Sequence, residues 1–186
     1  MPQNKFQRMV FAFLTVLVTV HSYVFYSLYV VNGNALMAAN QAGSVISAIN
    51  KQGGVYAFGK FLPIWAIILI EFLFAYSLEI IIGSPFSFKI ASGMFNPQKT
   101  RPVIFETVII SSTVLIMCPA MSFIAAWIYY PYYNGFNIFT LLANWIKLVC
   151  FNFPFALISQ VFFIQPLVRT VFKAVFNRET TEAVAD

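Results

Sequence analysis

The sequence predicts an all-α membrane protein, a four-transmembrane-helix bundle made of two tandem helix pairs. Of its 186 residues, 60% are hydrophobic and 9% are charged, whereas about a quarter of the residues of a soluble domain are charged. Four apolar runs follow one another, at residues 9–31, 61–83, 103–130 and 141–172. At about 1.5 Å per residue, a helix of each run can cross a hydrocarbon core of about 30 Å. Helices are expected because a spanning segment must satisfy its own backbone hydrogen bonds.

The first apolar run has a second interpretation, as the core of a secretory signal peptide. Lys5 and Arg8 precede it, and the small residues Ala38 and Ala39 follow it. A signal core has about 7 to 15 residues and this run is longer, so we expect a membrane-spanning helix. After it, residues 34–50 mix apolar side chains with Asn, Gln and Ser. That pattern predicts a short helix lying on the outer membrane surface.

Basic residues predict the orientation, because cytoplasmic flanks of membrane helices are rich in Lys and Arg. The flanks assigned to the cytoplasm hold Lys5, Arg8, Lys89, Lys99, Arg101, Arg169, Lys173 and Arg178. The opposite side holds Lys51, Lys60 and, just inside the last run, Lys147, which we expect to extend to the headgroups. We therefore predict a multi-pass protein of the cell membrane with both termini in the cytoplasm. The net charge of +5 does not indicate nucleic-acid binding, because the basic residues are scattered between apolar runs.

The two halves of the chain resemble each other. We expect a first helix pair with its outer loop (1–83), a Pro-rich cytoplasmic connector (84–102), a second helix pair (103–176) and a polar tail (177–186). An offset of 81 residues aligns Phe72 with Phe153, Phe74 with Phe155, Ala75 with Ala156, Pro85 with Pro166, Glu71 with Asn152 and Glu79 with Gln160. An internal repeat of two crossings is a parallel one, which predicts a pseudo-twofold axis along the membrane normal.

Several short segments carry a family resemblance: residues 1–7 (MPQNKFQ), 96–99 (NPQK), 117–122 (MCPAMS), 152–157 (NFPFAL) and 165–169 (QPLVR). They resemble the bacterial family called domain of unknown function 2798, over nearly the whole chain as two copies. This resemblance implies a tandem two-helix membrane protein and no established activity. In size and in its tandem pairs, the chain is more loosely similar to the proteobacterial antimicrobial compound efflux transporters. Their first helix carries a functional glutamate, whose comparable position here is Glu106 in the third run, while the first run has Phe13.

Three polar residues are candidates for proton coupling or ligand binding: His21, Glu71 and Asn152. A charged residue in hydrocarbon costs about 2.5 to 3.5 kcal/mol on insertion scales, and Glu71 falls near the middle of its run. It is either a proton-coupling or cation-binding group or a neutral acid bonded to another helix. His21 lies at a similar depth, as a relay partner of Glu71 or as an imidazole bonded to a backbone carbonyl or Ser22. Asn152 either lies at the same depth and belongs to the same site as His21 and Glu71, or its amide only bridges helices.

A second set of candidates, Glu79, Glu106 and Arg169, falls near the cytoplasmic ends of the runs. Ion pairing at the interface and a cytoplasmic cation entry are the two interpretations. Pro119 and Pro154 lie inside predicted helices, where each removes a backbone hydrogen bond, so we expect kinks.

The chain offers little for catalysis. It has a single histidine and none of the phosphate-loop, nucleophile or His-Glu-x-x-His motifs. Cys118 and Cys150 lie in apolar runs without metal-ligand spacing, which predicts buried free thiols. We expect no enzymatic activity, metal or cofactor, although Glu79, Glu106 and Arg169 would be the cluster for a lipid-acting enzyme.

Two functional hypotheses remain. The first is a small proton-coupled transporter or exporter of an apolar or cationic compound, whose partners are the lipid bilayer, protons and that compound. Four helices leave little room for a path, so it would work as a homodimer or larger assembly. The alternative is a non-transporting accessory or stress-related membrane protein whose polar groups only hold the bundle together.

Overall fold

The computed structural model describes residues 4–27, 54–130, 132 and 135–182. Within them, four helices are long and apolar enough to cross a membrane, which confirms the predicted fold class. The first is α1 (Lys5–Phe25) and the third is α6 (Pro102–Ile128). The second and fourth crossings are each built from three consecutive helical elements. These are α4 (Ile64–Leu78), η2 (Glu79–Gly83) and α5 (Ser84–Met94), and α7 (Ile138–Ser159), η4 (Gln160–Ile164) and α8 (Gln165–Glu182).

A small antiparallel hairpin, which the sequence did not predict, precedes the second crossing. It pairs β1 (Gly54–Ala57) with β2 (Lys60–Pro63). Phe58 and Gly59 form its two-residue turn with φ of 51° and 71°, as a type I′ turn requires. The Phe58 amide donates to the Ile128 carbonyl at 2.8 Å, which fixes the hairpin to the end of α6. The surface helix predicted for 34–50 lies outside the described residues.

The second crossing differs from the predicted apolar run at both ends. It starts at Ile64 and not at 61, because β2 continues to Pro63, whose ψ of 151° is extended. Its helix also continues through the 11 residues of α5, into the segment 84–102 that the sequence predicted as a connector. Pro85 is compatible with this continuation, since a proline in the first turn of a helix gives up no internal hydrogen bond. The candidate span of the fourth crossing ends at Phe176, while helix α8 continues into the predicted tail to Glu182.

Both composite crossings contain one π-helical turn, η2 at Glu79–Gly83 and η4 at Gln160–Ile164. The two turns start 81 residues apart, which equals the offset of the sequence alignment. Each is followed by a proline, Pro85 or Pro166, at the second residue of the next helix. Turns of this kind are rare and often lie at functional sites.

The helices pack in pairs and also across the pairs. α1 lies along α4, and α6 lies along α7; in addition, α6 contacts η2 and α5, while α1 contacts η4 and α8. Val16, Val20 and Val24, spaced four residues apart on α1, form a core with Ile67 and Ala75 of α4. Large apolar side chains cover the outside, with Trp65 70% and Phe139 78% exposed. A surface of this kind is suited to lipid.

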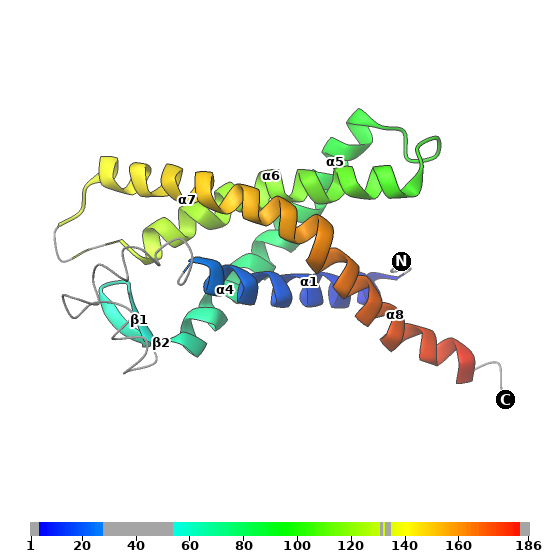
Figure 1. The fold of residues 1–186 in the computed structure, drawn as a ribbon, viewed down its shortest axis with the longest axis horizontal. Coiled ribbons are helices and arrows are strands. Elements are labelled where there is room, and N and C mark those ends of the chain that lie inside the picture. The colour runs from blue at the N-terminus through cyan, green and yellow to red at the C-terminus, as the bar shows by residue number, and fades with distance from the viewer. Residues whose placement is uncertain (1–3, 28–53, 131, 133–134, 183–186) are drawn as a thin grey trace.

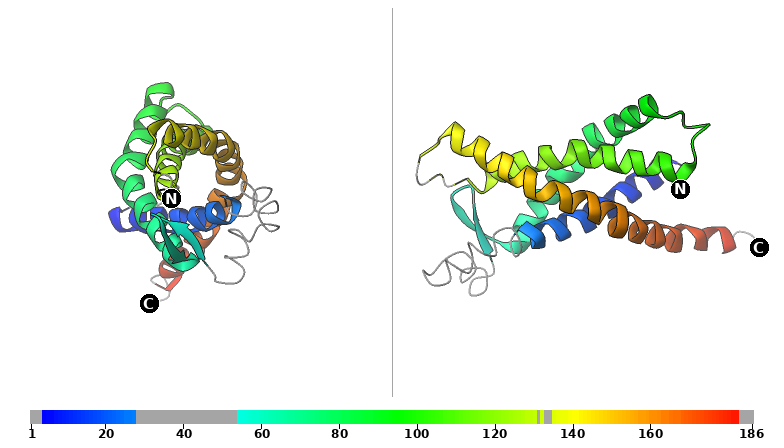
Figure 2. Two further views of the ribbon diagram at one scale, coloured as in Figure 1. Left: turned by 90° about the vertical axis from the view of Figure 1, so that its left-hand side faces the viewer. Right: turned by 45° about the horizontal axis from the view of Figure 1, so that its top comes forward.

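The start of α1, the end of α8 and the link between α5 and α6 lie at one end of the bundle, and the hairpin lies at the opposite end (Figure 1). Viewed along the bundle, the crossing helices are arranged around a common axis (Figure 2). We call the end with the hairpin the hairpin end and the other the terminal end.

Candidate functional site

All four crossings border one cavity of about 2040 Å³. Its lining is mostly apolar and includes residues of α1, α4, α6 and α7 as well as both π-helical turns. Ligand pockets for small molecules measure about 300 to 1,000 Å³, so this cavity has room for an apolar compound of considerable size. The polar side chains on its walls form the candidate site.

Glu71 lines the cavity from α4, and its partner is Tyr129 at the end of α6. The Tyr129 hydroxyl donates to Glu71 Oε1 at 2.6 Å. Burial raises the pKa of Tyr129 above its usual value, and the nearby Glu71 carboxyl raises it further. This phenol therefore keeps its proton. Because α4 begins at Ile64, Glu71 lies two turns, or about 10 Å, from the hairpin end of its helix. The sequence-based count of its depth started three residues earlier, at residue 61.

His21 lies apart from Glu71. Its side chain is exposed, and Nδ1 lies 2.7 Å from the Leu17 carbonyl oxygen of the same helix. The described lining of the cavity includes Glu71 and Asn152 but not His21. Of the two interpretations offered by the sequence, the structure has the imidazole bonded to a backbone carbonyl.

Asn152 is buried between helices, with 4% of its surface exposed. Its Nδ2 donates to Ser122 Oγ at 3.3 Å, while Oδ1 has no hydrogen-bond partner among the described residues. The Tyr23 hydroxyl of α1 donates weakly to the Asn152 backbone carbonyl at 3.5 Å. Cys118 belongs to the buried apolar cluster against which Tyr23 packs. We call these four residues the Asn152 cluster.

Sequence reasoning found Asn152 but missed the rest of this cluster. Cys118 and Ser122 are four residues apart, so they lie on one face of α6. Both belong to the MCPAMS segment, and Asn152 opens the NFPFAL segment. Two separate segments that carried the family resemblance therefore meet in the interior. Their shared resemblance was the sequence feature that could have indicated this contact.

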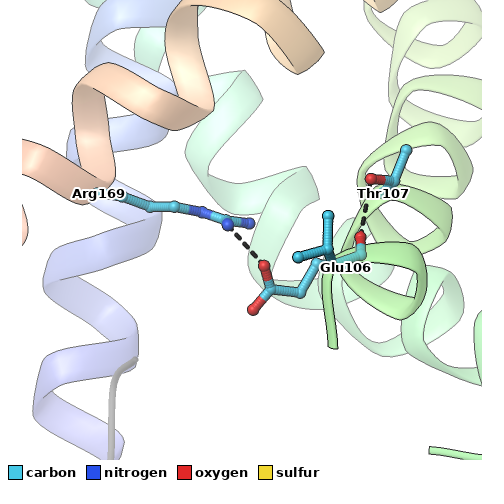
Figure 3. A network of polar contacts seen from close by, with 4 residues as sticks. Glu106, Thr107 and Arg169 are labelled. Carbon is cyan, nitrogen blue, oxygen red and sulfur yellow. Dashed lines mark hydrogen bonds and ion pairs between the residues drawn. The ribbon is translucent and has the colours of Figure 1, made fainter. Parts of the chain in front are cut away.

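The second set of candidates lies toward the terminal end of the cavity. Arg169 of α8 points at Glu106 of α6 (Figure 3), and the two form an ion pair of 2.5 Å. Glu79 in η2 instead accepts a hydrogen bond from the Ser84 hydroxyl at 2.8 Å. All three candidates line the cavity, and ion pairing is the arrangement found for Glu106 and Arg169.

The described side chains include no group of three His, Cys, Asp or Glu residues that could hold a metal ion. Cys118 is a free thiol and buried, as predicted, but the predicted burial is wrong for Cys150, which is a free thiol on the exposed surface of α7.

The fold and the cavity define a multi-pass membrane protein with four apolar crossings. The family model described as "Domain of unknown function (DUF2798)" matches residues 98–176, which hold the second helix pair. The match confirms the predicted resemblance to this family over residues 98–176. No significant match was found among curated proteins or among solved structures. The looser resemblance to efflux transporters is unconfirmed.

Proposed function

We propose that the protein is a small proton-coupled transporter of an apolar or cationic compound, and that Glu71 binds the coupling proton. The observation that carries the proposal is a carboxyl group in a mostly apolar cavity, held by a neutral phenol. A hydroxyl can donate to a carboxylate or accept from a carboxylic acid. Glu71 can therefore bind and release a proton without losing its partner, which an acid paired with arginine cannot.

The proposal places the protein in the cell membrane with both termini in the cytoplasm. The four crossings, with the start of α1 and the end of α8 at one end of the bundle, support placing both termini on the same side of the membrane. The basic residues of the terminal end support the cytoplasm as that side. We also propose an internal repeat of two helix pairs. The matched π-helical turns and the reciprocal contacts of α1 and α6 support it. The transporter would act as a homodimer, without enzymatic activity.

Transport can be tested in liposomes that contain only the purified protein, with tetraphenylphosphonium as an apolar cationic probe. A pH gradient should drive probe movement well above that of empty vesicles, and Glu71→Gln should reduce it by about tenfold or more. The glutamine keeps an oxygen that can accept from Tyr129, so the change removes the titratable group with little structural loss.

His21→Ala is the matched control, because His21 is polar but outside the cavity lining. It should leave the gradient-driven movement unchanged. Wild-type behaviour of Glu71→Gln, or movement equal to that of empty vesicles, would contradict the proposal.

The alternative, a non-transporting accessory protein, is favoured by one observation: several polar groups tie helices together. Besides the Glu106–Arg169 pair, Gln160 Nε2 donates to Thr19 Oγ1 at 2.8 Å, between η4 and α1. On this hypothesis Glu71→Gln lowers the melting temperature in detergent, and no apolar cation raises that of the wild type. A reproducible increase with tetraphenylphosphonium would rule it out.

A further inference from the structure

Two matched stripes of side chains face the cavity from the second and fourth crossings. One stripe is Glu71, Ala75 and Glu79, and the other is Asn152, Ala156 and Gln160; all six residues line the cavity. Within each stripe the residues are four apart, so they share one face of their helix. The members correspond at the same offset of 81 residues. The cavity therefore has two related walls, each with a small alanine between two polar side chains.

The two walls differ in one chemical property. The α4 wall carries two carboxyl groups, which can titrate, and the α7 wall carries two amides, which cannot. Both carboxyls are held by hydroxyls, Glu71 by Tyr129 and Glu79 by Ser84. In contrast, Glu106 is paired with the guanidinium of Arg169. Two acids therefore have neutral hydroxyl partners, and the third has a cationic partner.

An independent observation marks the same cavity as a place for a hydrogen-bonding ligand. Asn152, which corresponds to Glu71 on the opposite wall, is 4% exposed and its Oδ1 has no partner in the described part of the chain. A buried acceptor without a donor is unfavourable by about 1 to 3 kcal/mol. A donor that enters from the cavity would remove this cost.

We propose that Glu79 is a second proton-binding group, which works in series with Glu71 along the α4 wall. The proposal rests on the proposed function and extends it. Eight residues separate the two acids, or about 12 Å along the helix, and Ala75 leaves the space between them open. A proton leaves the carboxylic acid at one position, crosses through water in the cavity and binds the carboxylate at the other. Glu79 is nearer the terminal end and so exchanges protons with that side.

Other titratable groups line the cavity near Glu79. On the elements packed against η2 these are Arg8 and Tyr23 of α1, Glu71 of α4, and Glu106 and Cys118 of α6. Glu106 is already neutralised by Arg169. Within the described structure, the partner of the Glu79 carboxyl is the Ser84 hydroxyl.

Infrared difference spectroscopy of the protein in lipid nanodiscs tests the proposal without any ligand. Titration from alkaline to acidic buffer should produce two carbonyl bands of protonated carboxyl groups. Glu71→Gln should remove one band, Glu79→Gln the other, and the double variant both. Each glutamine keeps an oxygen for its hydroxyl donor, so loss of a band reports titration and not loss of the hydrogen bond.

Two control variants complete the experiment. Glu106→Gln should keep both bands, because the ion-paired carboxylate contributes neither. Ser84→Ala should keep the Glu79 band at a shifted frequency, because it removes the hydrogen bond but not the carboxyl. If Glu79→Gln leaves the wild-type spectrum unchanged, Glu79 does not bind a proton and the inference is wrong.

The failure of the inference can be told apart from failure of the proposed function. Two bands in a protein that does not move tetraphenylphosphonium would overturn transport alone. In liposomes, Glu79→Gln should reduce gradient-driven movement by at least about fivefold and leave probe exchange without a gradient intact. Equal loss of both activities would indicate a structural role for Glu79 and would overturn its role in proton coupling.

Discussion

At the scale of single residues, the hydrogen-bond partner decides what each glutamate can do. Glu106 and Arg169 form a charged pair whose side chains are 15% and 38% exposed. Glu71 and Glu79 have neutral hydroxyl partners from Tyr129 and Ser84. The same residue type therefore serves as a structural anion in one place and as a candidate proton carrier in two others.

The ion pair should contribute modestly to stability, because both groups retain some contact with solvent. We expect a coupling energy on the order of 1 kcal/mol from a double-mutant cycle of Glu106→Gln and Arg169→Leu. The measurement is the free energy of unfolding in detergent at low and high salt, and salt should weaken the coupling. Additive single-variant effects would show that the pair contributes nothing.

Position 83 requires a glycine, because the Glu79 side chain of the same π-helical turn lies against it. A Cβ at this position would collide with the Glu79 carboxyl and would lie 3.0 Å from Met117 Sδ. We expect Gly83→Ala to destabilise the protein by about 1 to 3 kcal/mol through overpacking, or to push the Glu79 carboxyl off its site. The measurements are the melting temperature in detergent and the Glu79 infrared band.

Gly93→Ala is the matched control in the same crossing. No atom lies within 4 Å of the Cβ it would add, so the alanine should stabilise α5 by roughly 0.5 to 1 kcal/mol. Equal effects of the two substitutions would show that the contact with Glu79 is unimportant.

At the scale of elements, aromatic side chains bridge the helices near both internal prolines. Trp145 Nε1 of α7 donates to the Pro119 carbonyl of α6 at 2.9 Å. The Tyr26 hydroxyl donates to the Phe151 carbonyl, three residues before Pro154, at 3.0 Å. A proline removes one backbone donor and bends its helix, so nearby carbonyls become accessible to another helix. Each bond ties two crossings together near an internal proline.

Trp145→Phe tests one of these bonds, because phenylalanine keeps an aromatic ring and loses the donor. Interhelical hydrogen bonds in membranes contribute about 0.6 kcal/mol on average and up to about 1.7, and we expect a loss in this range. The free energy of unfolding in detergent measures it. Trp65→Phe, at a side chain that is 70% exposed, is the control and should have little effect; equal losses would contradict the role of the Pro119 bond.

At the scale of the whole molecule, both helix pairs run in the same direction, and α1 begins at the end of the bundle at which α8 ends (Figure 1). The proposed orientation puts the terminal end in the cytoplasm. A fluorescent reporter that folds only in the cytoplasm should be active when fused after Asp186. Alkaline phosphatase, which needs an oxidising compartment, should be active when fused after residue 53 or in the link between α6 and α7. The opposite pattern would reverse the orientation.

The apolar composition of the chain allowed the four crossings to be predicted, because each run had to span a membrane of fixed thickness. The start of the second helix was predicted less well. The expected run began at residue 61, but the hairpin occupies residues up to Pro63. Short strands beside an apolar run are hard to recognise, because Phe61 and Leu62 are as apolar as the helix that follows.

The grouping of the candidate residues was also only partly predictable. The sequence placed His21, Glu71 and Asn152 in one layer by counting along each run. A depth count does not give the rotation of a helix about its axis, and this rotation puts His21 on the outside. It also brings Tyr129 to Glu71 across 58 positions of the sequence, a pairing that no local pattern indicates.

By itself the sequence determined that this is a membrane protein of four crossings, and it revealed the 81-residue correspondence of two polar positions. These properties depend on composition and spacing, which act locally along a helix. Only the tertiary structure decided that Glu71, Glu79, Asn152 and Gln160 line one cavity and that two of the three buried or half-buried acids have hydroxyl partners. Those properties depend on which helix faces meet, and packing across the whole bundle fixes that choice.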